Sequence, residues 1–286
     1  FDEPLAPLDF SHIQRLIDTL SSSHAEPANF LTAIQTQMDT LVKFVREKDL
    51  VFLDSTKPLV VRQAPGYLQG IALVSISAPG PYDKQGDTYY NVNDLTQYEP
   101  SVAESWLREY NDYMLQILNI HEAIPGHYVQ LAYANESPSQ ILSIFGSNTM
   151  IEGWACYAER MMLEAGYGAD SDELQLLYYK WYLRIIANTI IDIGVHTQNM
   201  SKDDVMELLV NGAFQESAEA ENKWQRVQRT QVQLCSYFNG LMEILDLRDE
   251  MMVQEGEQFD LRQFHDQFLG YGSAPVQYIR EAMLQE

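Results

Sequence analysis

The sequence predicts a mainly helical α+β protein in which one small β-sheet interrupts the helices. Apolar residues recur at spacings of three and four in residues 1–57 and again through 101–286, as they do in amphipathic helices. Residues 58–100 instead carry short β-branched and aromatic runs around the turn cluster Ala78-Pro-Gly-Pro81, which is typical of short strands. We therefore expect a helical segment at 1–57 and a second domain at 58–286, divided into a sheet region and a helical region at residue 100.

The N-terminal segment is expected to form two helices, over Phe10 to Leu20 and Phe30 to Leu50, separated by a turn around Ser21 to Pro27. Two to four strands should follow, and the runs that predict them are Leu59-Val-Val61, Ile71 to Ser77 and Asp87 to Val92. The edge of a sheet can bind an extended peptide by strand addition. A purely structural hairpin accounts for each strand equally well.

The C-terminal region should be a succession of helices. The first is a long helix from Ser101 to Ile120, which contains no proline or glycine, and it resumes after Pro125-Gly126 until Asn135-Glu-Ser-Pro138. The later helices are expected at Gln140–Phe145, Met150–Arg160, residues 171–199, a start at Ser201 that resembles a capping box, Ala218–Leu247 with an interruption at Gly240, Phe259–Leu269 and Val276–Leu284. Residues 171–199 are apolar on most sides, which predicts a central position.

The composition excludes several classes of protein. The 286 residues include 18 Lys and Arg against 41 Asp and Glu, a net charge of −23, which argues against binding nucleic-acid phosphates or anionic lipid headgroups. No stretch of about 20 apolar residues is present, so no membrane span is expected. Cys156 and Cys235 are too few for a disulfide framework or a cysteine-based zinc site, and the sequence leaves open whether they pair. The chain begins Phe-Asp-Glu-Pro, without Met or a signal peptide, as a mature product, a domain or a fragment would.

The most informative stretch is Asn119-Ile-His-Glu-Ala-Ile-Pro-Gly-His-Tyr128. His121 and His127 have good zinc-ligand side chains, and Glu122 could accept a proton from water beside them. The two histidines are six apart, so a straight helix would point them roughly 120° apart. Because proline interrupts a helix, we expect Pro125-Gly126 to bring His127 back beside His121. The alternative is an ordinary helix C-terminus with Gly126 as its cap.

Two glutamates on a later apolar helix could complete such a site. Glu152 lies among Ile151, Trp154 and other apolar residues, where an unpaired carboxylate would be costly to bury and a bound cation would offset that cost. Glu159 is two turns further along the same face, so it could orient a ligand histidine. The alternative is that both glutamates lie on a solvated helix face.

Three polar residues interrupt the apolar surface of residues 171–199, and they are Arg184, Asp192 and His196. Asp192 and His196 are four apart, so they can form a carboxylate–imidazole pair. A helix C-terminal position explains His196 equally well.

His-Glu-Ala-Ile-Pro-Gly-His at 121–127 and Glu-Gly-Trp-Ala-Cys-Tyr-Ala-Glu at 152–159 resemble the two signature segments of the bacterial domain-of-unknown-function family eight-eight-five, whose proteins are often described as lipoproteins. Three further segments resemble the same family, at Arg184–His196, Gln231–Arg248 and Phe259–Pro275. The resemblance implies a helical, zinc-metallopeptidase-like catalytic domain with a glutamate third ligand. It also implies that the chain corresponds to the C-terminal half of longer proteins, with a missing N-terminal half that packs against it. The location implied is the cell envelope or periplasm, with a lipid anchor in the missing half as an option.

The hypothesis that follows is a zinc hydrolase acting on peptides or small amides. One zinc ion would be bound by His121, His127 and Glu152, with Glu122 as the general base. The developing oxyanion would receive a hydrogen bond from His196 or Tyr237, or less directly from Arg184, and Asp192 would orient His196. Two alternatives remain, a non-catalytic envelope protein for binding or assembly and a metal-dependent amidase or esterase.

Overall fold

The computed structural model describes residues 10–69, 72–81, 83, 85–137 and 139–285. The helices are α1 Phe10–Ser21, α2 Phe30–Glu47, α3 Pro100–Glu109, α4 Met114–Glu122, α5 His127–Ala134, α6 Gln140–Ile144, α7 Asn148–Glu164, α8 Asp172–Gln198, α9 Lys202–Met206, α10 Ser217–Arg229, α11 Cys235–Glu255, α12 Leu261–Gly270 and α13 Val276–Met283, with a π-helical turn at Glu207–Gly212. The predicted class, mainly helical with a small sheet, is confirmed.

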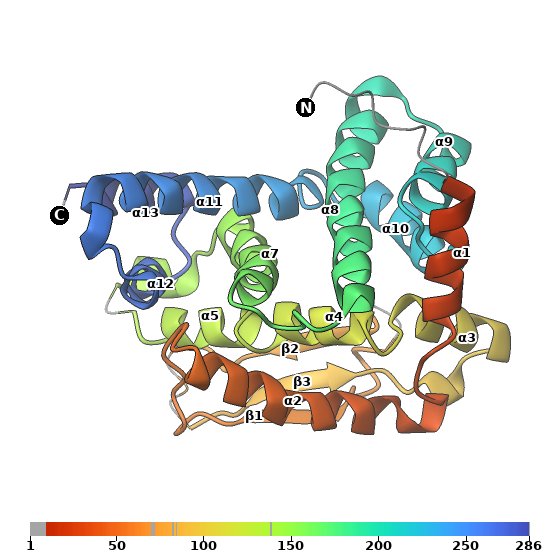
Figure 1. Ribbon diagram of the computed structural model, residues 1–286, viewed down its shortest axis with the longest axis horizontal. Coiled ribbons are helices and arrows are strands. Elements are labelled where there is room, and N and C mark those ends of the chain that lie inside the picture. Colours follow the sequence, from red (N-terminus) through yellow and green to blue (C-terminus); the bar gives the residue numbers. More distant parts are fainter. Residues whose placement is uncertain (1–9, 70–71, 82, 84, 138, 286) are drawn as a thin grey trace.

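The sheet has three described strands, β1 Leu59–Gln63, β2 Val74–Ser77 and β3 Thr88–Val92, in the order β1-β3-β2. β1 pairs parallel with β3, and β2 pairs antiparallel with it. Ile71, where the second strand was expected to begin, and Pro138, at the expected end of a helix, lie outside the described residues. The order leaves β2 at an edge of the sheet, beside α4 (Figure 1).

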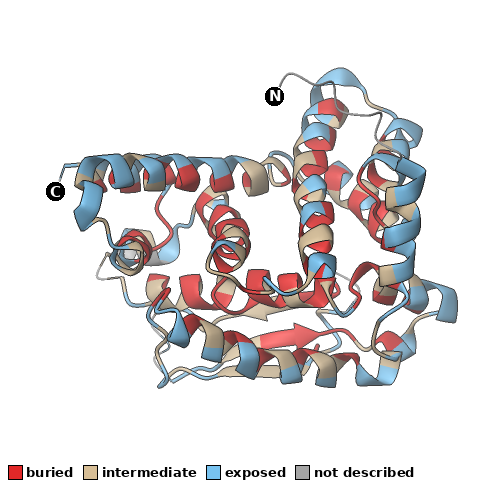
Figure 2. Cartoon of the chain, viewed as in Figure 1, coloured by how far each residue is buried: buried red, intermediate tan, exposed pale blue. Residues whose placement is uncertain are grey.

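The centre of the fold is α7, which lies between α11 and the α4–α5 pair (Figure 1). Most of α4 and α7 is buried (Figure 2), and one hydrophobic core runs from Phe30 in α2 through Tyr90 in β3 to Phe268 in α12. A second, smaller core joins α8 to α9 and α10 through Ile191, Val205 and other apolar residues. None of the helices in the described part of the chain combines the length and apolarity that a membrane span requires.

The prediction of one helix from Ser101 to Ile120 is wrong. The helix stops at Glu109 and α4 begins at Met114, because the Asn111 side chain accepts hydrogen bonds from the backbone N–H groups of Tyr113 and Met114 and donates one to the carbonyl of Arg108. Such local side-chain bonds compete with the helical ladder. The break turns α4 so that its C-terminal end can carry site residues.

The prediction of one helix from Ala218 to Leu247 is also wrong, and the break is not at Gly240. α10 and α11 are separated at residues 230–234, where Val232 has a φ of 64°, and Gly240 lies inside α11. The central position predicted for α8 holds for only one side of that helix. Its other side exposes an apolar row of Tyr179, Leu183, Ile190 and Ile193. The capping box at Ser201 is confirmed, with Asp204 as its partner.

Candidate metal centre

The turn between α4 and α5 brings the two histidines together. The backbone N–H of Gly126 donates to the carbonyl of Ile120 over 2.9 Å, so the chain folds back on the end of α4. A Cβ atom on Gly126 would lie 1.8 Å from the carbonyl oxygen of His121, which means that only glycine fits this approach. The ring centroids of His121 and His127 are consequently 4.8 Å apart.

Glu152 reaches the same point from α7. Its Oε2 atom lies 3.3 Å from Nε2 of His127 and 3.6 Å from Nε2 of His121. The Trp154 indole N–H donates to the carbonyl of Pro125 over 2.9 Å, which fixes α7 against the turn. A Cβ atom on Gly153 would lie 2.5 Å from Cα of Gly240 in α11, so a glycine on each helix allows α7 and α11 to cross closely beside Glu152.

These three residues fit a zinc ion. Ligand atoms of a tetrahedral zinc site lie roughly 3.3–3.6 Å apart when the bonds are about 2.0–2.2 Å long, and the two distances from Glu152 are 3.3 and 3.6 Å. All three ligand atoms lie within 4.8 Å of one another. Oε2 of Glu152 is buried without a hydrogen-bond partner among the described residues, and a cation would satisfy it.

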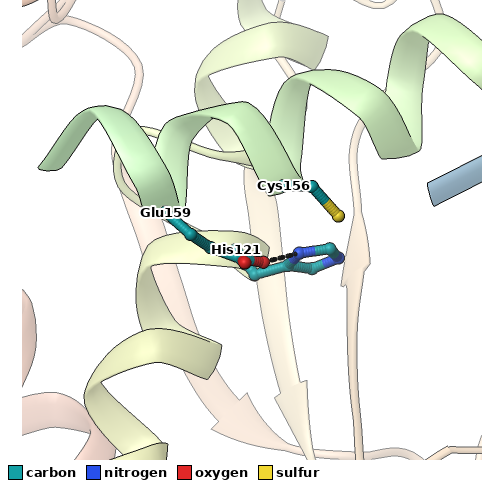
Figure 3. A group of neighbouring side chains, drawn as sticks. All are labelled: His121, Cys156 and Glu159. Atoms are coloured by element: carbon teal, nitrogen blue, oxygen red, sulfur yellow. Dashed lines mark hydrogen bonds and ion pairs between the residues drawn. The ribbon is translucent and has the colours of Figure 1, made fainter. Parts of the chain in front are cut away.

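The imidazole of His121 is oriented by Glu159, as a metal-ligating histidine usually is by an outer carboxylate. Nδ1 of His121 lies 2.5 Å from Oε1 of Glu159 (Figure 3), so Nε2 is left to face Glu152. Burial alone would lower the pKa of His121, but hydrogen bonds to Cys156, Glu152 and Glu159 outweigh burial and raise its pKa well above the usual value.

Cys156, His121 and Glu159 form a second group that could in principle hold a metal (Figure 3). Burial raises the pKa of the Cys156 thiol to about 12, so the thiolate that a metal needs is disfavoured. In this group Glu159 already lies 2.5 Å from Nδ1 of His121, a hydrogen bond that a metal between them would replace. The group that includes His127 and Glu152 is therefore the better metal site. Cys156 and Cys235 are both free in the structure.

A cavity of about 630 Å³ opens beside the three ligands. The residues that line it are Ala72, Val74, Ser75 and Ile76 around β2, His121, Glu122, His127 and Leu131 from the α4–α5 pair, Ile151 and Glu152 from α7, Asn222, Gln225, Arg226, Arg229 and Thr230 around α10, and Tyr237 from α11. Glu122 thus shares one space with the ligands. Burial raises the pKa of Glu122, which suits a carboxylate that must accept a proton.

Tyr237 lies beside the ligands, with its ring stacked on that of His121 at 6.1 Å between centroids. Arg226 donates a hydrogen bond to its hydroxyl oxygen over 2.8 Å, so the phenolic proton is free to be donated elsewhere. Burial raises the pKa of Tyr237 to about 12, which keeps that proton in place.

Sequence reasoning missed Arg226 and Gln233 as site residues. Gln233 accepts a hydrogen bond from Arg226 over 2.7 Å and donates one to Oε1 of Glu152 over 3.1 Å. Gln233 therefore links Arg226 on α10 to the carboxylate of Glu152 on α7. The only signal in the sequence was the pair of arginines at 226 and 229, three apart on a helix.

His196 and Asp192, in contrast, are not among the described residues that line the cavity. The two side chains face each other at 3.5 Å, but Nε2 of His196 lies 2.9 Å from the carbonyls of Val227 and Thr230. Asp192 accepts the backbone N–H groups of Leu234 and Cys235. Asp192 therefore holds the start of α11, two residues before Tyr237, and does not present a histidine to the cavity.

Arg184 is likewise not among the described lining residues. It belongs to a buried group of charges that we call the closed cluster, consisting of Glu109, Lys180, Arg184, Glu219 and Lys223. Lys180 lies 2.8 Å from Glu109, Arg184 forms ion pairs with Glu109 and Glu219, and Lys223 lies 3.3 Å from Glu219. The structure thus places Arg184 in an ionic network between α3, α8 and α10.

Comparison with known proteins confirms the family resemblance described above. A family model described as "Bacterial protein of unknown function (DUF885)" matches residues 5–283. No curated protein matches the chain.

Two solved structures are similar over nearly the whole chain. One is a candidate lipoprotein of unknown function from Shewanella oneidensis, with 52% identity and a TM-score of 0.88, matched over 99% of this chain and 51% of that one. The other is a candidate lipoprotein from Colwellia psychrerythraea, with 17% identity and a TM-score of 0.76, matched over 98% and 52%. The chain thus spans about half the length of either protein.

Proposed function

The chain belongs to the DUF885 family of bacterial proteins of unknown function, and we propose that it is a zinc-dependent hydrolase that cleaves peptide bonds. The observation that carries the proposal is the convergence of two imidazole nitrogens and an otherwise unpartnered carboxylate oxygen on one point, at distances that suit tetrahedral zinc. A metal site of three protein ligands leaves a fourth position for chemistry, and the cavity gives access to it.

The residues around this point have separate tasks. Zinc held by His121, His127 and Glu152 would supply Lewis acidity to a water and to the substrate carbonyl. Glu122 accepts the proton of the attacking water and passes it to the leaving nitrogen. Tyr237 donates its phenolic proton in a hydrogen bond to the oxygen that becomes negative, and Arg226 holds its hydroxyl for that purpose.

A peptide substrate is favoured by the strand at the cavity wall. β2 is an edge strand, and Val74, Ser75 and Ile76 line the cavity. An exposed edge offers backbone N–H and C=O groups to an extended chain. An ester or small amide would leave those groups unused, which is why we prefer a peptidase to the amidase or esterase alternative.

The two solved relatives suggest the setting of this activity. Both are described as candidate lipoproteins, so we place the protein in the cell envelope. In proteins of that greater length, we propose that the additional half packs against this chain and covers the open side of the cavity.

The test is hydrolysis of a panel of unstructured peptides by zinc-loaded protein, with and without a chelator. Glu122→Gln should keep zinc and lose roughly 10²–10⁴-fold in rate, because it removes the general base. Glu47→Gln, on the exposed face of α2, is the matched control and should keep full activity. Zinc-bound wild-type protein that cleaves nothing would instead favour the non-catalytic binding or assembly protein.

A further inference from the structure

The wall of the cavity formed by α10 consists of hydrogen-bond donors. Asn222, Gln225, Arg226 and Arg229 line the cavity from this helix, and their spacing of three, four and seven places them on one helix face. All four side chains carry N–H donors. No carboxylate and no aliphatic side chain of α10 is among the described lining residues.

The two arginines on this face differ in what occupies them. Arg226 is engaged by Gln233 and Tyr237. Arg229 is exposed and has no hydrogen-bond or ion-pair partner in the described part of the chain. Its guanidinium group is therefore free to bind an anion that enters the cavity.

With a zinc ion bound, the charges of the cavity would favour such an anion. The lining residues include two carboxylates, Glu122 and Glu152, and two guanidinium groups, Arg226 and Arg229. A zinc ion beside Glu152 would leave the cavity with an excess of positive charge. The protein as a whole carries a net charge of −23 and repels anions at long range, so Arg226 and Arg229 would supply a local attraction for an anion inside the cavity.

Taken together, these observations identify the group that the wall would recognise. We propose that Arg229, with Arg226 on the same face of α10, binds a carboxylate of the peptide substrate while β2 holds the peptide backbone. A guanidinium group binds a carboxylate through two parallel hydrogen bonds. The carboxylate is either the C-terminal one, which would make the protein a carboxypeptidase, or an acidic side chain near the cleaved bond. This inference rests on the proposed function and adds the substrate class to it.

Binding of labelled peptides tests the proposal without any turnover. The protein is zinc-loaded Glu122→Gln, and the probes are three fluorescein-labelled alanine pentapeptides. The first has a free C-terminus, the second a C-terminal amide, and the third a C-terminal amide with glutamate as its last residue. Fluorescence anisotropy gives each Kd.

We expect the free acid, the glutamate amide or both to bind about tenfold or more tightly than the plain amide, since a charge-assisted hydrogen bond is worth about 1.5–3 kcal/mol. The additional substitution Arg229→Gln should abolish that preference, and Arg229→Lys should keep only part of it, because lysine cannot form the paired hydrogen bonds. Arg46→Gln removes one charge from α2, outside this cavity, and should leave the preference intact. Tighter binding of the free acid alone assigns the C-terminal carboxylate, and tighter binding of the glutamate amide alone assigns an acidic side chain.

Equal binding of all three peptides, no binding of any, or a preference that survives Arg229→Gln would overturn the inference. Failure of the proposed function would be distinguishable from failure of this inference. If Arg229 confers the preference but wild-type protein cleaves none of the peptides, the carboxylate site stands and the hydrolase does not.

Discussion

Two groups of buried charges in this molecule are built in opposite ways. In the closed cluster, each charge faces an opposite charge of the protein within 3.5 Å. In the group of His121, His127, Glu152 and Glu159, which we call the site cluster, a carboxylate oxygen and two imidazole nitrogens converge beside a cavity, and the carboxylate oxygen lacks a hydrogen-bond partner among the described residues. Oε1 of Glu109 and Nη1 of Arg184 in the closed cluster also lack a hydrogen bond among the described residues, but they lie 3.5 Å apart as an ion pair. Oε2 of Glu152 instead faces the Nε2 atoms of two histidines, which are neutral when they bind a metal. A bound cation would therefore complete the site cluster, whereas every charge of the closed cluster already faces one of the opposite sign.

The difference shows that a polar residue on an apolar helix does not by itself identify a site. Arg184 and Glu152 are indistinguishable by that criterion, and both were candidate site residues. What separates them is whether the protein itself neutralises the charge. We expect substitutions in the closed cluster to reduce stability, and substitution of His127, the site-cluster histidine without a carboxylate on its Nδ1 atom, to abolish metal binding at little cost in stability.

The largest effect should come from Lys180→Met in the closed cluster. The substitution leaves Glu109 buried with one ion-pair partner fewer, and breaking a buried pair costs about 3–5 kcal/mol. Urea denaturation should show this loss, and zinc content should remain unchanged. Lys43→Met, which removes an exposed pair with Glu47, should behave as wild type. A loss for Lys180→Met no greater than that of the control would show that the closed cluster is not stabilising.

Gly240→Ala should be the next most disruptive, because it disturbs the helix crossing that supports the site cluster. The added Cβ would lie 1.9 Å from the carbonyl oxygen of Thr149, and relief of such overpacking costs about 1–3 kcal/mol. Zinc affinity should fall as well, since Glu152 lies beside the crossing. Gly270→Ala has no atom within 4 Å of the added Cβ and serves as the control. Unchanged denaturation and zinc affinity in Gly240→Ala would contradict this role.

The dependence of stability on pH tests the state of Lys223, a member of the closed cluster. Burial lowers the pKa of Lys223 to about 7, and the nearby charge of Arg184 contributes, although Glu219 opposes the shift. Because the folded state binds fewer protons than the unfolded state between that pKa and 10.5, stability should rise with pH in this window. The gain from pH 7 to pH 9 should be on the order of 2 kcal/mol more in wild type than in Lys223→Met. Parallel profiles for the two proteins would mean that Lys223 stays charged.

The smallest effect on stability should come from His127→Ala in the site cluster. Nδ1 of His127 has no hydrogen-bond partner among the described residues and the side chain lines an open cavity. Its Nε2 atom lies 3.3 Å from Glu152, but that carboxylate keeps its hydrogen bond from Gln233, so the zinc-free variant should lie within about 1 kcal/mol of wild type. Zinc should raise the melting temperature of wild type by binding the folded state and leave that of the variant unchanged. A large loss of stability in the zinc-free variant would show that the site cluster, like the closed cluster, stabilises the fold without a ligand.

The sequence predicted the helical class, the small sheet and most helix ends, because these depend on periodicity and local capping. It missed the break at residues 110–113, which depends on the side-chain hydrogen bonds of Asn111. It also missed the break at 230–234, where the cap is Asp192 from a helix 40 residues earlier. A break made by one local side chain, or by a distant one, leaves no signal in the periodicity of apolar residues.

The residues of the candidate site likewise fall into those that the local sequence predicted and those that only the fold brings together. His121, Glu122 and His127 lie within seven residues, and the proline and glycine between them indicated a sharp turn. Gln233 is 81 residues from Glu152, to which it donates a hydrogen bond, and nothing in its local sequence indicates that contact. Arg226 and Arg229 were expected on a helix, but only the fold shows that they line the same cavity as the histidines.

The most direct test of this account is the zinc content of the purified protein after zinc loading and gel filtration, measured by elemental analysis. Wild type and Lys180→Met should each retain about one zinc ion per chain, whereas His121→Ala and Glu152→Ala should retain almost none. A zinc-free wild type, or full zinc retention in both His121→Ala and Glu152→Ala, would contradict the metal centre.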